Sequence, residues 1–274
     1  MNPLTHVFIT KRLIDEHNLR VDEDQCILGS VISDLACLNA INYKKAHEDP
    51  LGFIHYLMEK DPEMVSVGYG MLLHSEKPGG VDKYTHGPNG FIEEHEMAMF
   101  EIVSKYKHKM HAGQLKGFIH ALIEWSCDSL LTKREANLLN RSFRNVDTKR
   151  LSFHLANYFD GDGKKLKRIF RFLRRFNFNQ LTHVKGVAKC WDRFEFYQRM
   201  ADKKGLRMMT HITSAWSLIK HNNTVEMIER ARDHLRNIYP AYLDFLHGQL
   251  SENLVPHFPQ PIKVSKIQSG FSEQ

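Results

Sequence analysis

The sequence predicts an all-α protein, built as a multi-helix bundle. Apolar residues recur at helical spacing along most of the 274 residues, and the alternation typical of strands is scarce. One example is the stripe Leu28, Val31, Ile32 and Leu35, which falls on one side of a helix. An apolar content of 42% is typical of a chain that folds around a core.

Each helix is expected between recognisable start and stop signals. Several early segments begin at or just after a proline, which suits the first turn of a helix. Thr132 with Glu135 three residues later indicates a capping box. The turn at residues 160–163 superficially resembles a calcium loop but lacks the later ligand positions. The expected helices are 3–16, 24–38, 51–60, 62–74, 91–108, 112–131, 132–144, 148–159, 164–176, 184–203, 208–220 and 224–250.

The charge divides the chain into two unlike halves. Residues 1–128 carry 12 Lys and Arg against 19 Asp and Glu, whereas residues 129–274 carry 26 against 13. Because no clear linker separates these halves, we expect one helical domain over residues 1–253. It would have an acidic, histidine-rich half at 1–130 and a basic half at 131–253. Residues 254–274 contain three prolines and are expected to form an extended tail.

The composition favours a cytoplasmic protein. No signal peptide is evident, and no apolar run is long enough to cross a bilayer. The four cysteines show no CxxC spacing, so we expect them to be reduced, buried and without a metal-binding role.

Two pairs of potential metal ligands stand at helical spacing in the acidic half. Asp82 and His86 are four residues apart, and His120 and Glu124 repeat that spacing within an apolar run. A helix places side chains at i and i+4 on one face, where an imidazole and a carboxylate can share one metal ion.

Other histidines and one aspartate in this half also come beside apolar segments. A lone histidine on an apolar helix is more often structural than a ligand, so only the whole set indicates a metal site. Its nitrogen and oxygen ligands suffice for two or three zinc-type ions, each with a position open to water. The candidate metal ligands are His6, Asp34, His47, His74, Asp82, His86, His120 and Glu124.

At these residues the chain resembles the zinc-dependent phospholipase C family, which shares its fold with the S1/P1 single-strand nucleases. The resemblance covers roughly residues 1–130 and implies an all-α fold with a trinuclear zinc site. His47, His74 and Asp82 would then serve one ion, and His86, His120 and Glu124 a second. His6 would complete a third, with Asp82 bridging.

The sequence departs from that family's pattern in three ways. The family usually has His-x-x-x-Asp at its central motif, whereas residues 75–81 separate His74 from Asp82, and the pair Glu94–His95 is an alternative. Secreted members use a free amino terminus as a ligand, which cannot be assumed for Met1. The third departure is the absence of a secretion signal.

The resemblance implies hydrolysis of a phosphodiester, in a phospholipid or a nucleotide, by metal-activated water. Asp34 and Glu124 are the candidate catalytic residues, and Asp34 would orient or deprotonate the attacking water. The basic helix 164–176 is a candidate contact for nucleic acid or an anionic membrane surface. Its Arg171, Arg174 and Arg175 are candidates for binding the substrate phosphate.

Two other classes of function remain open at this point. The chain could be a non-catalytic all-α module whose basic half binds nucleic acid or an anionic membrane surface. It could also be a helical HD-type phosphohydrolase, but the acidic half contains no adjacent His-Asp pair. Metal stoichiometry separates the module from the hydrolase.

Overall fold

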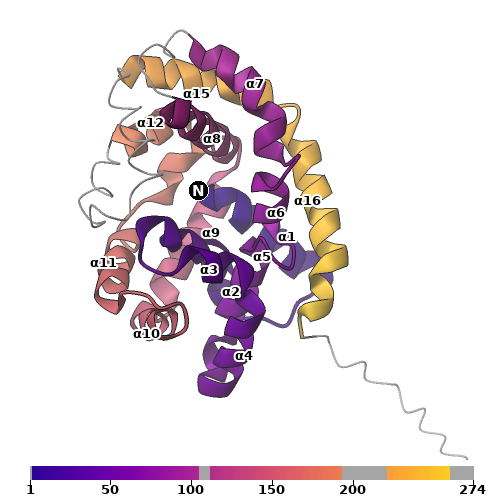
Figure 1. The fold of residues 1–274 in the computed structure, drawn as a ribbon, viewed down its shortest axis with the longest axis vertical. Coiled ribbons are helices and arrows are strands. Elements are labelled where there is room, and N and C mark those ends of the chain that lie inside the picture. The colour runs from indigo at the N-terminus through magenta and orange to yellow at the C-terminus, as the bar shows by residue number, and fades with distance from the viewer. Residues whose placement is uncertain (1, 105–111, 193–220, 260–274) are drawn as a thin grey trace, which may run out of the picture.

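A computed structural model describes residues 2–104, 112–192 and 221–259, and within these ranges the chain is helical without a strand (Figure 1). The all-α fold expected from the sequence is thereby confirmed. The α-helices are α1 (Pro3–His17), α2 (Glu23–Ile32), α3 (Tyr43–Glu48), α4 (Pro50–Lys60), α5 (Val65–His74), α6 (Val81–His86), α7 (Phe91–Val103), α8 (Ala112–Asp128), α9 (Lys133–Asn145), α10 (Thr148–Tyr158), α11 (Gly163–Leu173), α12 (Val184–Asp192), α15 (His221–Leu235) and α16 (Tyr239–Asn253). Short 3-10 helices are η1 (Ser33–Leu38), η2 (Pro62–Met64), η4 (Phe178–Thr182) and η5 (Val255–His257).

A continuous apolar core joins the two halves of the chain. Its buried residues run from Leu4 to Phe258, and α9 of the basic half packs against α1 and α2 of the acidic half. In Figure 1, α1, α5 and α6 lie toward the middle of the molecule, with α16 along one side and α10 and α11 on the other. The change of composition near residue 130 is therefore a change of surface charge and not a break in the core.

The most extensive helix contact is between α2 and α5, which cross at glycines. A Cβ on Gly70 would lie 2.0 Å from the carbonyl oxygen of Cys26 and 2.7 Å from the Cα of Gly29. A side chain cannot be accommodated there because the neighbours are backbone atoms. The crossing brings the C-terminal end of α5, which ends at His74, alongside α2.

Local start signals account for several helix boundaries. The capping box at α9 is confirmed, because Thr132 Oγ1 accepts the Arg134 N–H at 3.1 Å and the Glu135 carboxylate accepts the Thr132 N–H at 3.0 Å. The side chain of Asp162 accepts two backbone N–H groups in the first turn of α11, at 2.9 and 3.0 Å. The turn at residues 160–163 therefore ends in a helix cap.

Some expected elements differ in the structure. The single helix expected over 224–250 is two helices, α15 and α16, with Pro240 in the first turn of the second. A proline fits a first turn but not a helix interior, which explains the break. His47 lies on α3, a helix that was not predicted. The expected helix 208–220, the end of 91–108 and the end of 184–203 fall outside the described residues.

The segment expected as a tail is packed over its first part. Leu254 and Phe258 are buried, and the Phe258 ring stacks on Tyr69 with centroids 4.8 Å apart. The chain thus belongs to the core as far as residue 258, and residues 260–274 are not described.

All four cysteines are free thiols. Cys26, Cys127 and Cys190 are buried as expected, whereas Cys37 is partly exposed. Among the described helices, none combines the length and apolarity needed to cross a bilayer.

Candidate metal centre

The first candidate ligand, His6, is positioned by an unusual start to α1. The side chain of the N-cap residue makes no capping hydrogen bond. The cap comes from Asp128 at the end of α8, whose carboxylate accepts the backbone N–H groups of Leu4 at 3.3 Å and Thr5 at 3.1 Å. The Thr5 hydroxyl also contacts Asp128, at 3.1 Å, and lies 2.6 Å from the hydroxyl of Tyr239. The first turn of α1 is thereby tied to α8.

The rings of His74 and His47 are each oriented by a backbone carbonyl. His74 Nδ1 lies 2.8 Å from the carbonyl oxygen of Ser30, across the α2–α5 crossing. His47 Nδ1 lies 2.9 Å from the carbonyl oxygen of Tyr43, one turn earlier on α3. When Nδ1 donates its proton in this way, Nε2 is left as the metal-ligating atom. Both Nε2 atoms face the carboxylate of Asp82.

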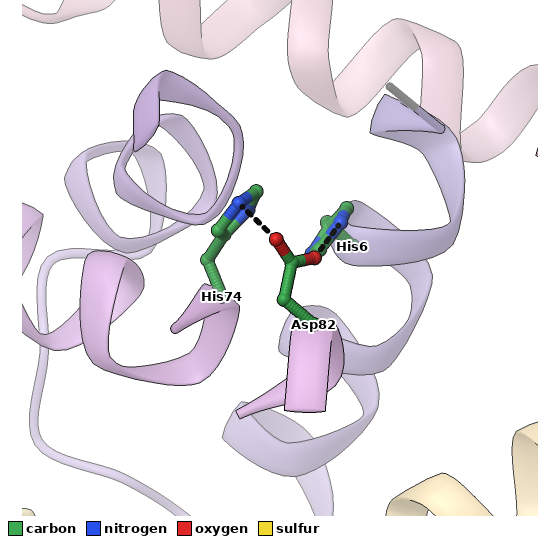
Figure 2. A group of neighbouring side chains, drawn as sticks. All are labelled: His6, His74 and Asp82. Atoms are coloured by element: carbon green, nitrogen blue, oxygen red, sulfur yellow. Dashed lines mark ion pairs between the residues drawn. The ribbon is translucent and has the colours of Figure 1, made fainter. Parts of the chain in front are cut away.

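Asp82 stands between histidines from three other helices. Figure 2 shows its carboxylate between the rings of His6 and His74, with one oxygen toward each. Oδ1 lies 3.6 Å from His6 Nε2 and 3.5 Å from His86 Nε2. Oδ2 lies 3.2 Å from His74 Nε2 and 3.5 Å from His47 Nε2. The two oxygens therefore serve different histidines, as in a carboxylate that bridges two ions.

The connection between α5 and α6 explains how Asp82 reaches this place despite its longer spacing from His74. Residues 76–80 turn the chain back, and the backbone N–H groups of Glu76 and Lys77 donate to the carbonyl oxygen of His47 at 2.9 and 3.2 Å. A Cβ on Gly80 would lie 2.5 Å from the carbonyl oxygen of Leu73, so the turn requires glycine. The loop returns α6 beside the end of α5.

His86, His120 and Glu124 form a further cluster between α6 and α8. The rings of the two histidines stack with centroids 4.8 Å apart. Their Nε2 atoms lie 3.6 and 3.4 Å from Glu124 Oε1. The side chains of His86 and His120 are 22% and 31% exposed, whereas that of His74 is fully buried. This end of the site opens to solvent.

All eight candidate metal ligands thus fall into three groups of atoms within 4.8 Å of one another. Asp34 joins through Oδ1, 4.0 Å from His74 Nε2. We call them the His47 group (Asp34, His47, His74), the His6 group (His6, His74, Asp82) and the His120 group (His86, His120, Glu124).

The spacing among the eight ligands suits side chains arranged around metal ions. The separations between imidazole nitrogens and carboxylate oxygens run from 3.2 to 4.0 Å. A direct N–H···O hydrogen bond is shorter, at about 2.9–3.0 Å. Metal bonds of ~2.0–2.1 Å at a tetrahedral angle place two ligand atoms about 3.3–3.4 Å apart. Buried atoms such as Asp82 Oδ1 make no hydrogen bond within the described structure.

The buried carboxylates of the cluster also favour binding of a cation. Among the described residues, no Lys or Arg lies within ion-pair distance of Asp34 or Asp82, and the basic groups within that distance are imidazoles. Burial would raise the pKa of Asp82, but His74 and His86 outweigh it and hold that pKa well below its usual range. Burial would lower the pKa of His74, but Asp82 and Asp34 raise it to about 9. A proton on His74 thus balances charge that a metal ion can balance instead.

The neighbouring His6 behaves in the opposite way. Burial and the charge on His74 lower the pKa of His6 well below its usual value. His6 is therefore neutral near pH 7, which is the form that binds metal.

Other residues considered from the sequence lie elsewhere. The ring of His95 packs edge-on against Phe91 and His234 and belongs to none of the three groups, so Asp82 and not Glu94–His95 joins the cluster. Met1 lies outside the described residues. The side chains of Arg171, Arg174 and Arg175 line a separate groove to which none of the eight ligands contributes.

Sequence reasoning missed the residues that hold the ligands in place. Asp128 had a usable signal, because it continues the row of His120 and Glu124 at the same four-residue interval. The carbonyl groups of Ser30 and Tyr43 had none, since any residue supplies a carbonyl.

Comparison with known proteins adds no relative: the chain matches no family model, no curated protein and no solved structure. The fold and the geometry of the site therefore carry the functional argument.

Proposed function

We propose that this protein is a metal-dependent phosphoester hydrolase of the phospholipase C type, which hydrolyses a phosphodiester. The observation that carries the proposal is the convergence of eight imidazole and carboxylate side chains, from six separate helices, at ligand-to-ligand distances. Histidine and carboxylate ligands without thiolates are typical of hydrolytic metal sites.

The proposed ligand sets follow the three groups. His47, His74 and Asp82 Oδ2 would hold one ion beside Asp34, and the His120 group would hold a second. His6 with Asp82 Oδ1 would hold a third, so that Asp82 bridges two positions. Zinc suits these donors, which are imidazoles and carboxylates, and another divalent metal is the alternative.

The chemistry divides between bound ions and the chain's own groups. Bound zinc supplies Lewis acidity toward phosphoryl oxygens and makes water a nucleophile at neutral pH. The buried carboxylate of Asp34 would orient the attacking water and accept its proton. Glu124 would hold its ion between His86 and His120, and the exposure of those two rings marks the side where a phosphate ester enters.

Metal content tests the proposal most directly. Protein purified without added metal should contain two or more zinc ions per chain by elemental analysis. His74→Ala and His120→Ala should each lower that number, whereas His55→Ala, which changes an exposed histidine outside all three groups, should not. Metal content that is unchanged in both site variants would remove the proposal.

Activity tests the second half of the claim. A panel of phosphodiesters and phosphomonoesters, including a phospholipid and a dinucleotide, should reveal turnover that needs zinc or manganese. Asp34→Asn should lower the turnover by about a hundredfold or more, as expected for loss of a general base. Bound metal without turnover of any ester would instead favour the non-catalytic module.

A further inference from the structure

Six basic side chains line a groove at the meeting of three helices. The groove has a volume of about 510 Å³. Its walls are the last turn of α9, the first turn of α10, and the outer face and C-terminal end of α11. The residues that line this basic groove are Arg144, Thr148, Lys149, Lys167, Arg171, Arg174 and Arg175.

The packing of α11 explains why its charges gather there. Leu166, Ile169, Phe170 and Leu173 form the buried face of this helix. Lys167 and Arg171 stand one turn apart on the opposite, exposed face, with Arg174 and Arg175 one turn further. The groove is therefore a built feature of the α9–α11 arrangement.

Within the described part of the chain, these cations form no internal ion pairs. Among the described residues, none of the six basic side chains of the groove lies within ion-pair distance of a carboxylate. Their neighbours along the chain are paired: Arg141 binds Glu23 and Asp24, and Arg150 binds Asp61 and Glu63. Asp147, the acidic residue nearest in sequence, is engaged in capping α10.

Like charges held together without partners repel one another, so they lower the stability of the fold unless an anion is bound. Four of the six cations are arginines, whose planar guanidinium groups bind phosphate through two parallel hydrogen bonds. The groove therefore has enough hydrogen-bond donors to bind more than one phosphate group.

The lining also limits the kind of anion. None of the described residues that line the groove is aromatic, so none of them stacks a base, as residues in sites for single-stranded nucleic acid do. The same described residues include no aliphatic one that could receive an acyl chain. Its volume falls within the ~300–1,000 Å³ of small-ligand sites.

We propose that the basic groove binds a compact anion carrying several phosphate groups, either free or as the head group of a lipid. This binding site is separate from the metal centre and does not depend on the proposed hydrolase activity. It assigns Arg171, Arg174 and Arg175 to this second site and not to the substrate of the metal centre.

Two matched double variants of the full chain test the proposal. Lys167→Gln/Arg171→Gln removes one lysine and one arginine from the groove. Lys164→Gln/Arg168→Gln removes the same two residue types, at the same spacing, from exposed positions of α11 that do not line it. Calorimetric titration with tripolyphosphate should show binding that falls about tenfold or more in the first variant and much less in the second. Thermal unfolding should show the first variant to be at least as stable as the wild type.

Several outcomes would overturn the proposal. Equal losses in the two variants would mean that diffuse surface charge binds the anion, and unchanged binding in both would place the anion outside the groove. If tripolyphosphate bound no more tightly than inorganic phosphate, the groove would recognise only one phosphate group at a time. If a single-stranded oligonucleotide bound more tightly than tripolyphosphate, and Lys167→Gln/Arg171→Gln abolished that binding, nucleic acid would be the ligand.

Vesicles distinguish the two sources of the anion. Phosphatidylcholine vesicles containing phosphatidylinositol bisphosphate are compared with vesicles brought to the same surface charge with phosphatidylserine. Preference for the former, lost in Lys167→Gln/Arg171→Gln, identifies a lipid head group. Binding of free tripolyphosphate alone identifies a soluble anion, and equal binding to both vesicles would contradict the proposal.

Discussion

Replacing Gly70 by alanine should separate α2 from α5 and disturb the metal centre at a distance. The added Cβ would lie 2.0 Å from the Cys26 carbonyl oxygen and 2.7 Å from both Gly29 Cα and the Ser30 backbone nitrogen. All three neighbours are backbone atoms, so no side-chain rotation relieves the clash. The helices must move apart by about 1 Å or more to reach ordinary contact distances.

The size of the effect follows from that displacement. Overpacking costs about 1–3 kcal/mol, and the better helix propensity of alanine returns about 1 kcal/mol. The hydrogen bond from His74 Nδ1 to the Ser30 carbonyl, now 2.8 Å, would stretch beyond its range and cost about 1 kcal/mol more. The expected net loss is about 2 kcal/mol, or a fall in Tm of ~4–8 °C for a domain of this size.

Thermal unfolding of chelator-treated protein measures the loss without the stabilisation that bound metal adds. Gly248→Ala is the matched control, because Gly248 lies inside α16 with open space around its Cβ position and should gain about 0.5–1 kcal/mol from the substitution. Zinc titration of Gly70→Ala should also show weaker binding, since His74 moves. If Gly70→Ala were as stable as Gly248→Ala, the close α2–α5 crossing would be refuted.

Three further outcomes are expected from the metal centre. In metal-free protein the pKa of His74 is raised from 6.5 to about 9, so its protonation stabilises the fold fully below pH 6.5 and this stabilisation is lost as the pH rises through about 9. Urea unfolding of wild type and His74→Asn between about pH 6 and 9 measures this contribution to the free energy of unfolding. The same pH dependence in both proteins would contradict the prediction. Asp82→Asn should remove more than one zinc ion per chain and His120→Ala only one, because the two oxygens of Asp82 face different histidines; equal losses by elemental analysis would argue against bridging. Asp128→Asn should lower stability by about 1–3 kcal/mol in thermal unfolding and weaken zinc binding at the His6 group, with the His120 group unaffected; an unchanged zinc titration would show that the cap does not position His6.

Short-range spacing made the α6 and α8 ligands visible in the sequence. Asp82 with His86, and His120 with Glu124, each stand four residues apart, and helix geometry alone puts such side chains on one face. Apolar periodicity likewise predicted the helical class, because a buried helix face repeats at a fixed interval.

The remaining ligands meet through tertiary structure, which no local pattern reports. The separation of His74 from Asp82 looked unfavourable in the sequence, yet the turn through Gly80 closes it. His47 was expected outside the predicted helices, but it lies on α3, where the Tyr43 carbonyl orients its ring. Backbone carbonyls and a close helix crossing have no sequence signature beyond a glycine. This part of the site could therefore not be predicted from the sequence.

The charge asymmetry of the chain has two different uses in the fold. Part of the positive charge of the second half docks onto the acidic half, as Arg141 does with Glu23 and Asp24. Arg150 does the same with Asp61, which also lies 2.7 Å from His154 Nε2. These acids are occupied by arginine, whereas Asp34 and Asp82 in the same half meet only histidines among the described residues. Arginine stays protonated, whereas histidine can lose its proton. Only the histidines around Asp34 and Asp82 can therefore exchange a proton for a metal ion. The same distinction separates the paired arginines from those of the basic groove, whose charge is left for an external anion.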